Sequence, residues 1–168
     1  MEVSIAELLL MISQKTKEMK EIYFDVINSI YIMKDRELDG SETILNEVSD
    51  FNVVIDKYEA IINDINRYKN ILNIANSTIK TQSGMTISEA MNYINSLRKK
   101  VELYDILAGK KTKLSREFDG NGSSSYYKVS ELNYNADTYK NLKDILNTSI
   151  STLEADIANT NATNFVTI

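Results

Sequence analysis

The sequence has no proline, no cysteine and no histidine among its 168 residues, and it has only 5 glycines. Proline breaks helix interiors because it lacks an N–H donor and its ring clashes with the preceding turn, so its absence over this length favours long helices. Without cysteine the chain forms no disulfide and no thiolate metal site. Without histidine it lacks the most common general base and zinc ligand. We therefore expect a protein without enzyme activity, cofactor or metal.

Charge and hydropathy argue against nucleic acid and lipid bilayers as partners. The formal net charge of −5 disfavours non-specific binding to nucleic acid or to anionic lipid. No stretch approaches the roughly 20 apolar residues that span a bilayer. Residues 1–12 lack a basic region, and their apolar run is too short for a secretory signal. We expect a cytoplasmic protein with no nucleic-acid partner.

Four segments carry apolar residues at helical spacing. Two of them open with a capping box, in which a Ser or Thr oxygen and a Glu carboxylate satisfy free N–H groups of the first turn. These boxes are Ser4-x-x-Glu7 and Thr86-x-x-Glu89. The spacing predicts helices over about 4–27, 42–76, 87–117 and 135–160.

Two short segments rich in β-branched and aromatic residues lie between these helices. Residues 29–33 either continue the first helix or form a strand, and residues 126–132 form a second candidate strand. In an up-down-up-down arrangement both segments lie at one end, where they pair as a ribbon that needs support from the helices or from a second chain. The predicted fold is mainly α. It is one domain over 1–168, an antiparallel four-helix bundle with coiled-coil character and this short two-stranded ribbon.

The second predicted helix carries a heptad pattern with alternating spacings of four and three residues, which is typical of coiled coils. Val54, Ile61 and Tyr68 widen the apolar stripe, so this helix is expected to contact more than one partner. The heptad residues pack either inside the bundle or between subunits, and they predict a homo-oligomer assembled through helix faces. This candidate packing seam consists of Ile44, Val48, Phe51, Ile55, Tyr58, Ile62 and Ile65.

A basic stretch interrupts the acidic chain between residues 98 and 117, where seven basic and three acidic residues give a local charge of +4. Such a stretch suits an acidic protein, a lipid headgroup or nucleic acid. The simpler interpretation, which we favour, is a solvated face neutralised by acidic neighbours. The candidate basic surface consists of Arg98, Lys99, Lys100, Lys110, Lys111, Lys113 and Arg116.

Three parts of the sequence resemble the septicolysin-like family of small bacterial proteins. Residues 4–10, Ser-Ile-Ala-Glu-Leu-Leu-Leu, are similar to the start of that family. Asn73 and Asn76, followed by Gly84 and the Thr86 capping box, resemble its Asn-rich turn and helix start. Residues 162–168, Ala-Thr-Asn-Phe-Val-Thr-Ile, resemble a closing Ala-Asn-Trp-Thr-Thr-Glu-Leu, with phenylalanine in place of tryptophan and no acidic residue.

The residues that carry this resemblance are expected at one end of the bundle, where the loop after the second helix meets the C-terminal tail. They form either a functional patch or a network of caps and turns that closes the bundle, and the second interpretation is the simpler. The candidate patch consists of Asn73, Asn76, Thr86, Glu89, Asn164 and Phe165.

The sequence thus predicts a non-enzymatic, self-assembling coiled-coil interaction protein. The family takes its name from a cytolysin, so the resemblance implies an alternative, a pore-forming or membrane-acting protein. Only under that alternative do we expect a membrane as partner. The resemblance supplies no catalytic residues.

Overall fold

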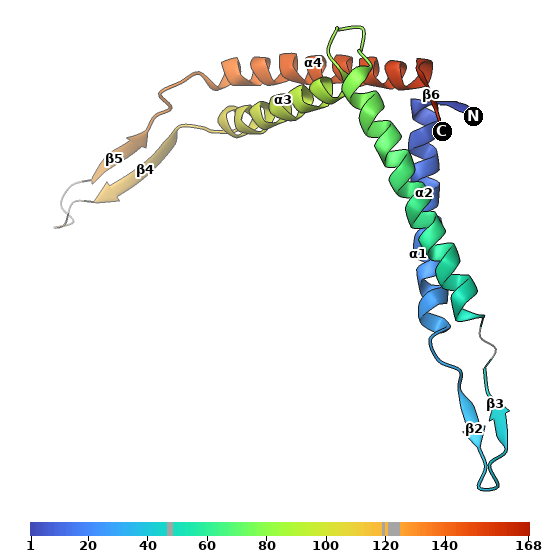
Figure 1. Ribbon diagram of the computed structural model, residues 1–168. Coiled ribbons are helices and arrows are strands. Elements are labelled where there is room, and N and C mark those ends of the chain that lie inside the picture. Colours follow the sequence, from blue (N-terminus) through green and yellow to red (C-terminus); the bar gives the residue numbers. More distant parts are fainter. Residues whose placement is uncertain (47–48, 119, 121–124) are drawn as a thin grey trace. The chain divides into compact units, whose positions relative to one another are not determined.

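The computed structural model describes residues 1–46, 49–118, 120 and 125–168. These residues are mainly helical and form four helices, α1 (Ile5–Asn28), α2 (Phe51–Thr78), α3 (Ile87–Ala108) and α4 (Ala136–Thr163) (Figure 1). Their short strands are β1 (Glu2–Ser4), β2 (Lys34–Arg36), β3 (Glu42–Ile44), β4 (Lys113–Phe118), β5 (Ser125–Ser130) and β6 (Phe165–Thr167). The chain divides into two compact units. Unit 1 comprises Met1–Ile79 and Ala158–Ile168, and unit 2 comprises Lys80–Ile157.

Both predicted capping boxes are confirmed. In the first, the Glu7 backbone N–H donates to Ser4 Oγ over 3.1 Å, and the Ser4 backbone N–H donates to Glu7 Oε2 over 2.7 Å. Thr86 and Glu89 repeat this exchange at the start of α3, over 3.2 and 2.7 Å. Each box satisfies N–H groups that the first helical turn leaves without an intrahelical partner.

Unit 1 is built on α1 and α2, which run antiparallel and side by side (Figure 1). Val3, Leu8 and Tyr68 form a buried cluster near one end of this pair. Antiparallel pairing of β1 with β6 closes that end, with Ser4 opposite Phe165. At the other end, β2 pairs with β3 in an antiparallel hairpin.

Unit 2 has the same plan. Ile94 and Leu97 of α3 and Ile150 of α4 form its buried cluster. One end is closed by an isolated antiparallel bridge between Lys80 and Thr86. At the other end, β4 pairs with β5 as a six-residue antiparallel hairpin.

The two units are an internal structural repeat. Ser4 and Thr86, which cap equivalent helices, are 82 positions apart, and α2 and α4 are both 28 residues long. Every position of one heptad pattern on α1 is buried or half-buried, and so is every position 82 residues later on α3. Residues on α2 and α4 that are 85 positions apart match in the same way. The seam of α1 consists of Ile5, Leu8, Ile12, Lys15, Met19, Ile22 and Val26, and it matches Ile87, Ala90, Ile94, Leu97, Val101, Tyr104 and Ala108 on α3. The seam of α2 consists of Val54, Tyr58, Ile61, Ile65, Tyr68, Leu72 and Ala75, and it matches Tyr139, Lys143, Leu146, Ile150, Leu153, Ile157 and Thr160 on α4.

The two central helices are shorter than predicted. Helix α2 begins at Phe51 rather than 42, because residues 42–44 form β3 and Asp50 caps the helix through its carboxylate. Helix α3 ends at Ala108 rather than 117, with Gly109 as its C-cap, because residues 113–118 form β4. The outer helices differ from the predicted 4–27 and 135–160 by three residues or fewer at each end.

The predicted pairing of 29–33 with 126–132 is wrong. Helix α1 continues to Asn28, and the strand that follows is Lys34–Arg36, paired with its own neighbour β3. The second predicted strand forms at Ser125–Ser130 and pairs with β4. Local hairpins form instead, because closing a short loop costs less conformational entropy than joining distant segments. Gly40, at φ 88°, supplies the left-handed turn residue between β2 and β3.

Candidate interaction surfaces

The β4–β5 hairpin presents one apolar face to solvent. Strand pairing puts Leu114 opposite Val129 and Arg116 opposite Tyr127. Side chains alternate between the two faces of a strand, so these four residues share a face with Phe118. Leu114, Phe118, Tyr127 and Val129 are each more than half exposed. We call these four residues, together with Arg116, the hairpin face.

Arg116 is held across the hairpin face. Its guanidinium donates to Ser125 Oγ from Nε over 3.2 Å and from Nη2 over 2.9 Å. Its Cζ atom lies 5.4 Å from the centre of the Phe118 ring, within the range of a cation–π contact. The opposite face is polar, since Glu117 accepts a hydrogen bond from the Tyr126 hydroxyl over 3.2 Å. The hairpin is therefore amphipathic and carries a positive charge within its apolar face.

The candidate basic surface separates into neutralised and exposed residues. Arg98 forms an ion pair with Glu154 of α4, as expected of a face neutralised by acidic neighbours. Lys99, Lys100, Lys110, Lys111 and Lys113 are all exposed. The described residues of 109–118 and 125–130 include five basic side chains and a single acidic one, Glu117. Positive charge is thus concentrated on and beside the hairpin face.

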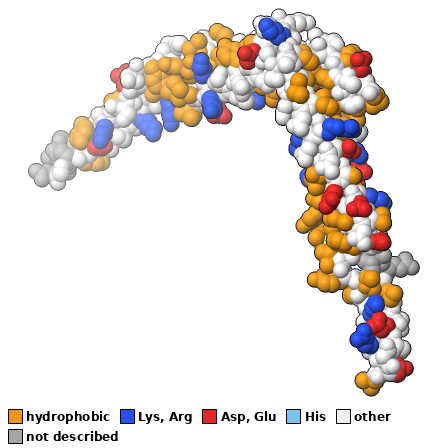
Figure 2. Space-filling view, viewed as in Figure 1, with side chains coloured by type: hydrophobic (Ala, Val, Ile, Leu, Met, Phe, Trp, Pro, Cys, Tyr) orange, Lys and Arg blue, Asp and Glu red, His pale blue; other side chains and the backbone are white. Residues whose placement is uncertain are grey.

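A second apolar surface lies on unit 1 near the C-terminal end of α1. Figure 2 shows hydrophobic side chains gathered over the part of the α1–α2 pair that leads to β2 and β3. Tyr23 packs edge-on against Phe24 with ring centroids 6.0 Å apart, and its ring lies 6.2 Å from that of Tyr58. Phe24, Ile27 and Phe51 are also exposed. We call Tyr23, Phe24, Ile27 and Phe51 the aromatic face.

Acidic residues outnumber basic ones in the segment that carries the aromatic face. The described residues between 18 and 64 include eleven acidic and four basic side chains. Glu42 of β3 is paired with Lys34 and Arg36, and the hydrogen bonds from Arg36 and Lys34 lower its pKa. Asp25, Asp56 and Glu59 take part in no ion pair within the part of the chain that the structure describes. The segment that carries the aromatic face therefore has an excess of negative charge.

The candidate packing seam is divided between the core and the surface. Ile65 is buried, whereas Ile55, Tyr58 and Ile62 are half-buried and Phe51 is exposed. Ile44 lies on β3 and is exposed, and Val48 lies outside the described residues. The buried positions of α2 follow a heptad through Val54, Ile61 and Tyr68, the residues that the sequence marked only as widening the stripe.

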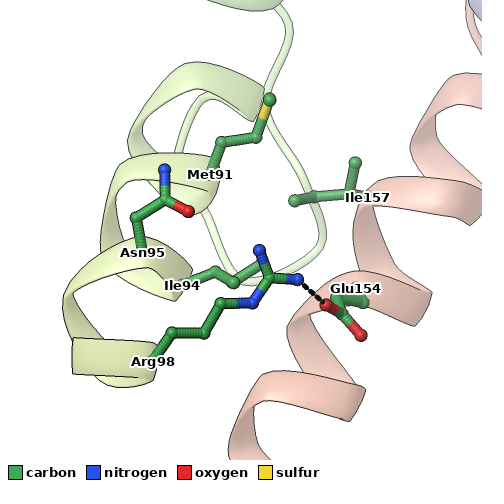
Figure 3. Close-up of a pocket in the computed structure, with 6 residues that line it drawn as sticks. All are labelled: Met91, Ile94, Asn95, Arg98, Glu154 and Ile157. Carbon is green, nitrogen blue, oxygen red and sulfur yellow. Dashed lines mark hydrogen bonds and ion pairs between the residues drawn. The ribbon is translucent and has the colours of Figure 1, made fainter. Parts of the chain in front are cut away.

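Unit 2 contains a shallow groove between α3 and α4, with a volume of about 200 Å³ (Figure 3). Met91 and Ile94 line one side and Ile157 lines the other, while Arg98 reaches across to Glu154, where its Nη2 donates over 2.5 Å. The ion pair spans the groove. The groove is open and shallow, and its only charged lining residues neutralise one another, so it offers no evident selectivity for a small ligand.

The candidate patch is divided between the two units. Asn73, Asn76, Asn164 and Phe165 belong to unit 1. Asn164 ends α4, where its backbone N–H and its side-chain amide both donate to the Thr160 carbonyl, over 3.1 and 2.9 Å. The roles that the structure shows for Asn164 and Phe165 are capping and strand pairing.

The remaining patch residues, Thr86 and Glu89, belong to unit 2 and form its capping box. Hydrogen bonding to the backbone N–H of Thr86 lowers the pKa of Glu89. Beside them, the backbone N–H groups of Gln82 and Ser83 donate to the Asp156 carboxylate over 2.9 and 3.0 Å. Burial alone raises the pKa of Asp156, but these backbone bonds outweigh it and the net shift is downward.

The described residues contain no cluster of metal ligands and no helix suited to span a membrane. No three acidic side chains there lie close enough to hold a metal ion. None of the described helices combines the length and the hydropathy that crossing a membrane requires.

Comparison with known proteins supports the fold. No protein-family model and no curated protein matches the sequence. Among solved structures, the chain is similar to a functionally unknown conserved protein from Corynebacterium diphtheriae, with a TM-score of 0.68 and 17% sequence identity. The similarity covers 99% of this chain and 100% of that chain. At this identity the similarity shows the fold alone.

Proposed function

We propose that the protein is a non-enzymatic interaction protein that assembles with further copies of itself through exposed apolar faces. The observation that carries this proposal is the amount of apolar side chain left outside the helix pairs. Among the described residues, 28 large hydrophobic side chains are exposed, whereas 13 hydrophobic residues are buried. A pair of helices buries one stripe of each helix and leaves the remaining stripes in solvent.

The candidate packing seam supplies part of this apolar surface. Phe51, Ile55, Tyr58 and Ile62 form a partly exposed stripe beside the buried stripe of α2. A second copy packed against this stripe would bury it. The antiparallel four-helix bundle over 1–168, the single domain and the resemblance to the septicolysin-like family stay predictions.

Light scattering across a dilution series tests the proposal. We expect a mass of at least twice the 19.1 kDa of one chain, falling towards one chain on dilution. Ile55→Asp and the more exposed Phe51→Asp should weaken the assembly while the far-ultraviolet circular dichroism stays helical. Asn70→Asp introduces the same charge at an exposed position of α2 and serves as the control. A mass of one chain at every concentration would contradict the proposal.

A further inference from the structure

We propose that the hairpin face of one copy docks onto the aromatic face of a second copy. The inference rests on the proposed self-assembly and adds which two surfaces meet. The contact is heterologous, because a surface of unit 2 meets a different surface, on unit 1 of the other copy. Such contacts close into a dimer if they are reciprocal and otherwise produce rings or filaments.

The hairpin face needs a partner for physical reasons. An isolated two-stranded hairpin is at best marginally stable in water, and it gains stability when a face is packed against another element. Here both strands run for six residues, and the apolar side chains Leu114, Phe118, Tyr127 and Val129 are left exposed on one side. Arg116, held between Ser125 and the Phe118 ring, places a positioned cation among them. The chemistry of this face suits a surface that is both apolar and acidic.

The aromatic face has this chemistry. Its two α1 rings, Tyr23 and Phe24, are packed against each other and exposed, so a partner can bury them without ordering new side chains. Asp25, Asp56 and Glu59 supply negative charge along the same helix pair. Exposed rings of this kind are typical of residues that contribute most to binding, and acidic neighbours steer a basic partner towards them.

Charge selects a second copy over other partners. Unit 1 holds eight basic and fourteen acidic residues, whereas unit 2 holds eleven basic and ten acidic residues. The acidic unit repels anionic lipid and nucleic acid, although the hairpin alone would attract them. Each copy carries one hairpin face and one aromatic face, so every hairpin face has a matching acidic and apolar surface on another copy.

Charge reversal with mixing tests the contact. The hairpin variant is Lys110→Glu, Lys111→Glu and Lys113→Glu, and the acidic variant is Asp25→Lys, Asp56→Lys and Glu59→Lys. Sedimentation equilibrium at low salt should show that each variant alone self-associates about tenfold or more weakly than the wild type. An equimolar mixture of the two should recover the association, since the reversed charges are complementary again. The matched control, Lys99→Glu, Lys100→Glu and Lys140→Glu, reverses three exposed lysines outside the contact and should associate as the wild type does.

The other possible outcomes of these measurements distinguish a failure of the contact from a failure of self-assembly. Wild-type protein that is monomeric at all concentrations would overturn both the self-assembly and this contact. A wild-type multimer that both reversed variants retain would overturn the contact alone.

Raising salt to about 1 M should weaken the wild-type assembly, because the screening length falls to about 3 Å. Binding of the wild type to phosphatidylglycerol vesicles, lost in the hairpin variant while self-association persists, would assign the hairpin face to lipid and overturn the proposal.

Discussion

Glu7 and Glu89 close the starts of α1 and α3, and the N–H groups of Ser4 and Thr86 lower their pKa below the usual value of 4.5. A carboxyl group whose pKa is lower in the folded state stabilises the fold above its unfolded pKa. That contribution is lost as pH falls through the lowered folded pKa. Glu42 adds to the same trend, because Arg36 and Lys34 lower its pKa.

We therefore expect the free energy of unfolding to fall as pH is lowered from about 5 towards about 3. Glu7→Gln with Glu89→Gln should keep both capping boxes, because glutamine accepts the same hydrogen bonds, but should make this fall shallower. Urea unfolding at a series of pH values, followed by circular dichroism, measures the slope. An unchanged slope in the double variant would assign the acid sensitivity to other carboxyl groups.

At the scale of the elements, the sequence predicted the starts of α1, α3 and α4 to within one residue, but it missed the start of α2 and the register of helix packing. Ser4 and Thr86 mark the starts of their helices in the sequence, because a capping box is stabilised by hydrogen bonds between residues that are close in sequence. Which stripe of α2 is buried depends on its contacts with α1, and the local sequence pattern of α2 does not reveal those contacts. Two heptad readings share Tyr58 and Ile65, and only the structure shows that Ile61, rather than Ile62, is buried between them.

The hairpins were missed for a related reason. Residues 42–44 and 113–117 continue the helical spacing of their neighbours, so periodicity alone extended the helices through them. Pairing across Gly40 in one hairpin, and between β4 and β5 in the other, gives these residues a partner that helical spacing does not reveal. Two capping boxes 82 positions apart were the sign of the repeat that the sequence offered.

The difference between the predicted and the observed buried stripe of α2 leads to a prediction about stability. Ile61 is 5% exposed, whereas Ile55 is half-buried. Ile61→Ala should lower the free energy of unfolding by about 2–4 kcal/mol, because it removes buried methyl groups and leaves a cavity. Ile55→Ala should cost clearly less under conditions in which the protein is monomeric. Guanidinium denaturation of both variants at low protein concentration provides the comparison, and equal losses would mean that the two positions are buried alike.

At the scale of the whole molecule, each unit carries its own buried cluster, Leu8 with Tyr68 in unit 1 and Leu97 with Ile150 in unit 2. Separate cores allow regions of one chain to open with different free energies. Leu97→Ala should therefore speed amide hydrogen exchange in α3 and in residues 136–157 more than in α1 and α2. Mass spectrometry of peptides after exchange measures this difference. Equal acceleration in every helix would show that the chain unfolds as a single cooperative unit.

Each helix pair also carries one half-buried lysine in its packing seam, and the two lysines occupy different places in the repeat. Lys15 Nζ lies 3.7 Å from Asp64 on α2, whereas the equivalent position on α4 is Ser149. Lys143 Nζ lies 2.8 Å from Asp105 on α3, whereas the equivalent position on α1 is Tyr23. If α1 folded against α4, Lys15 would lose Asp64 but keep Glu18 of its own helix at 3.2 Å, whereas Lys143 would lose Asp105. A chain with two similar helix pairs risks pairing the wrong helices during folding. We therefore expect these two ion pairs to favour the pairing of each helix with its own neighbour.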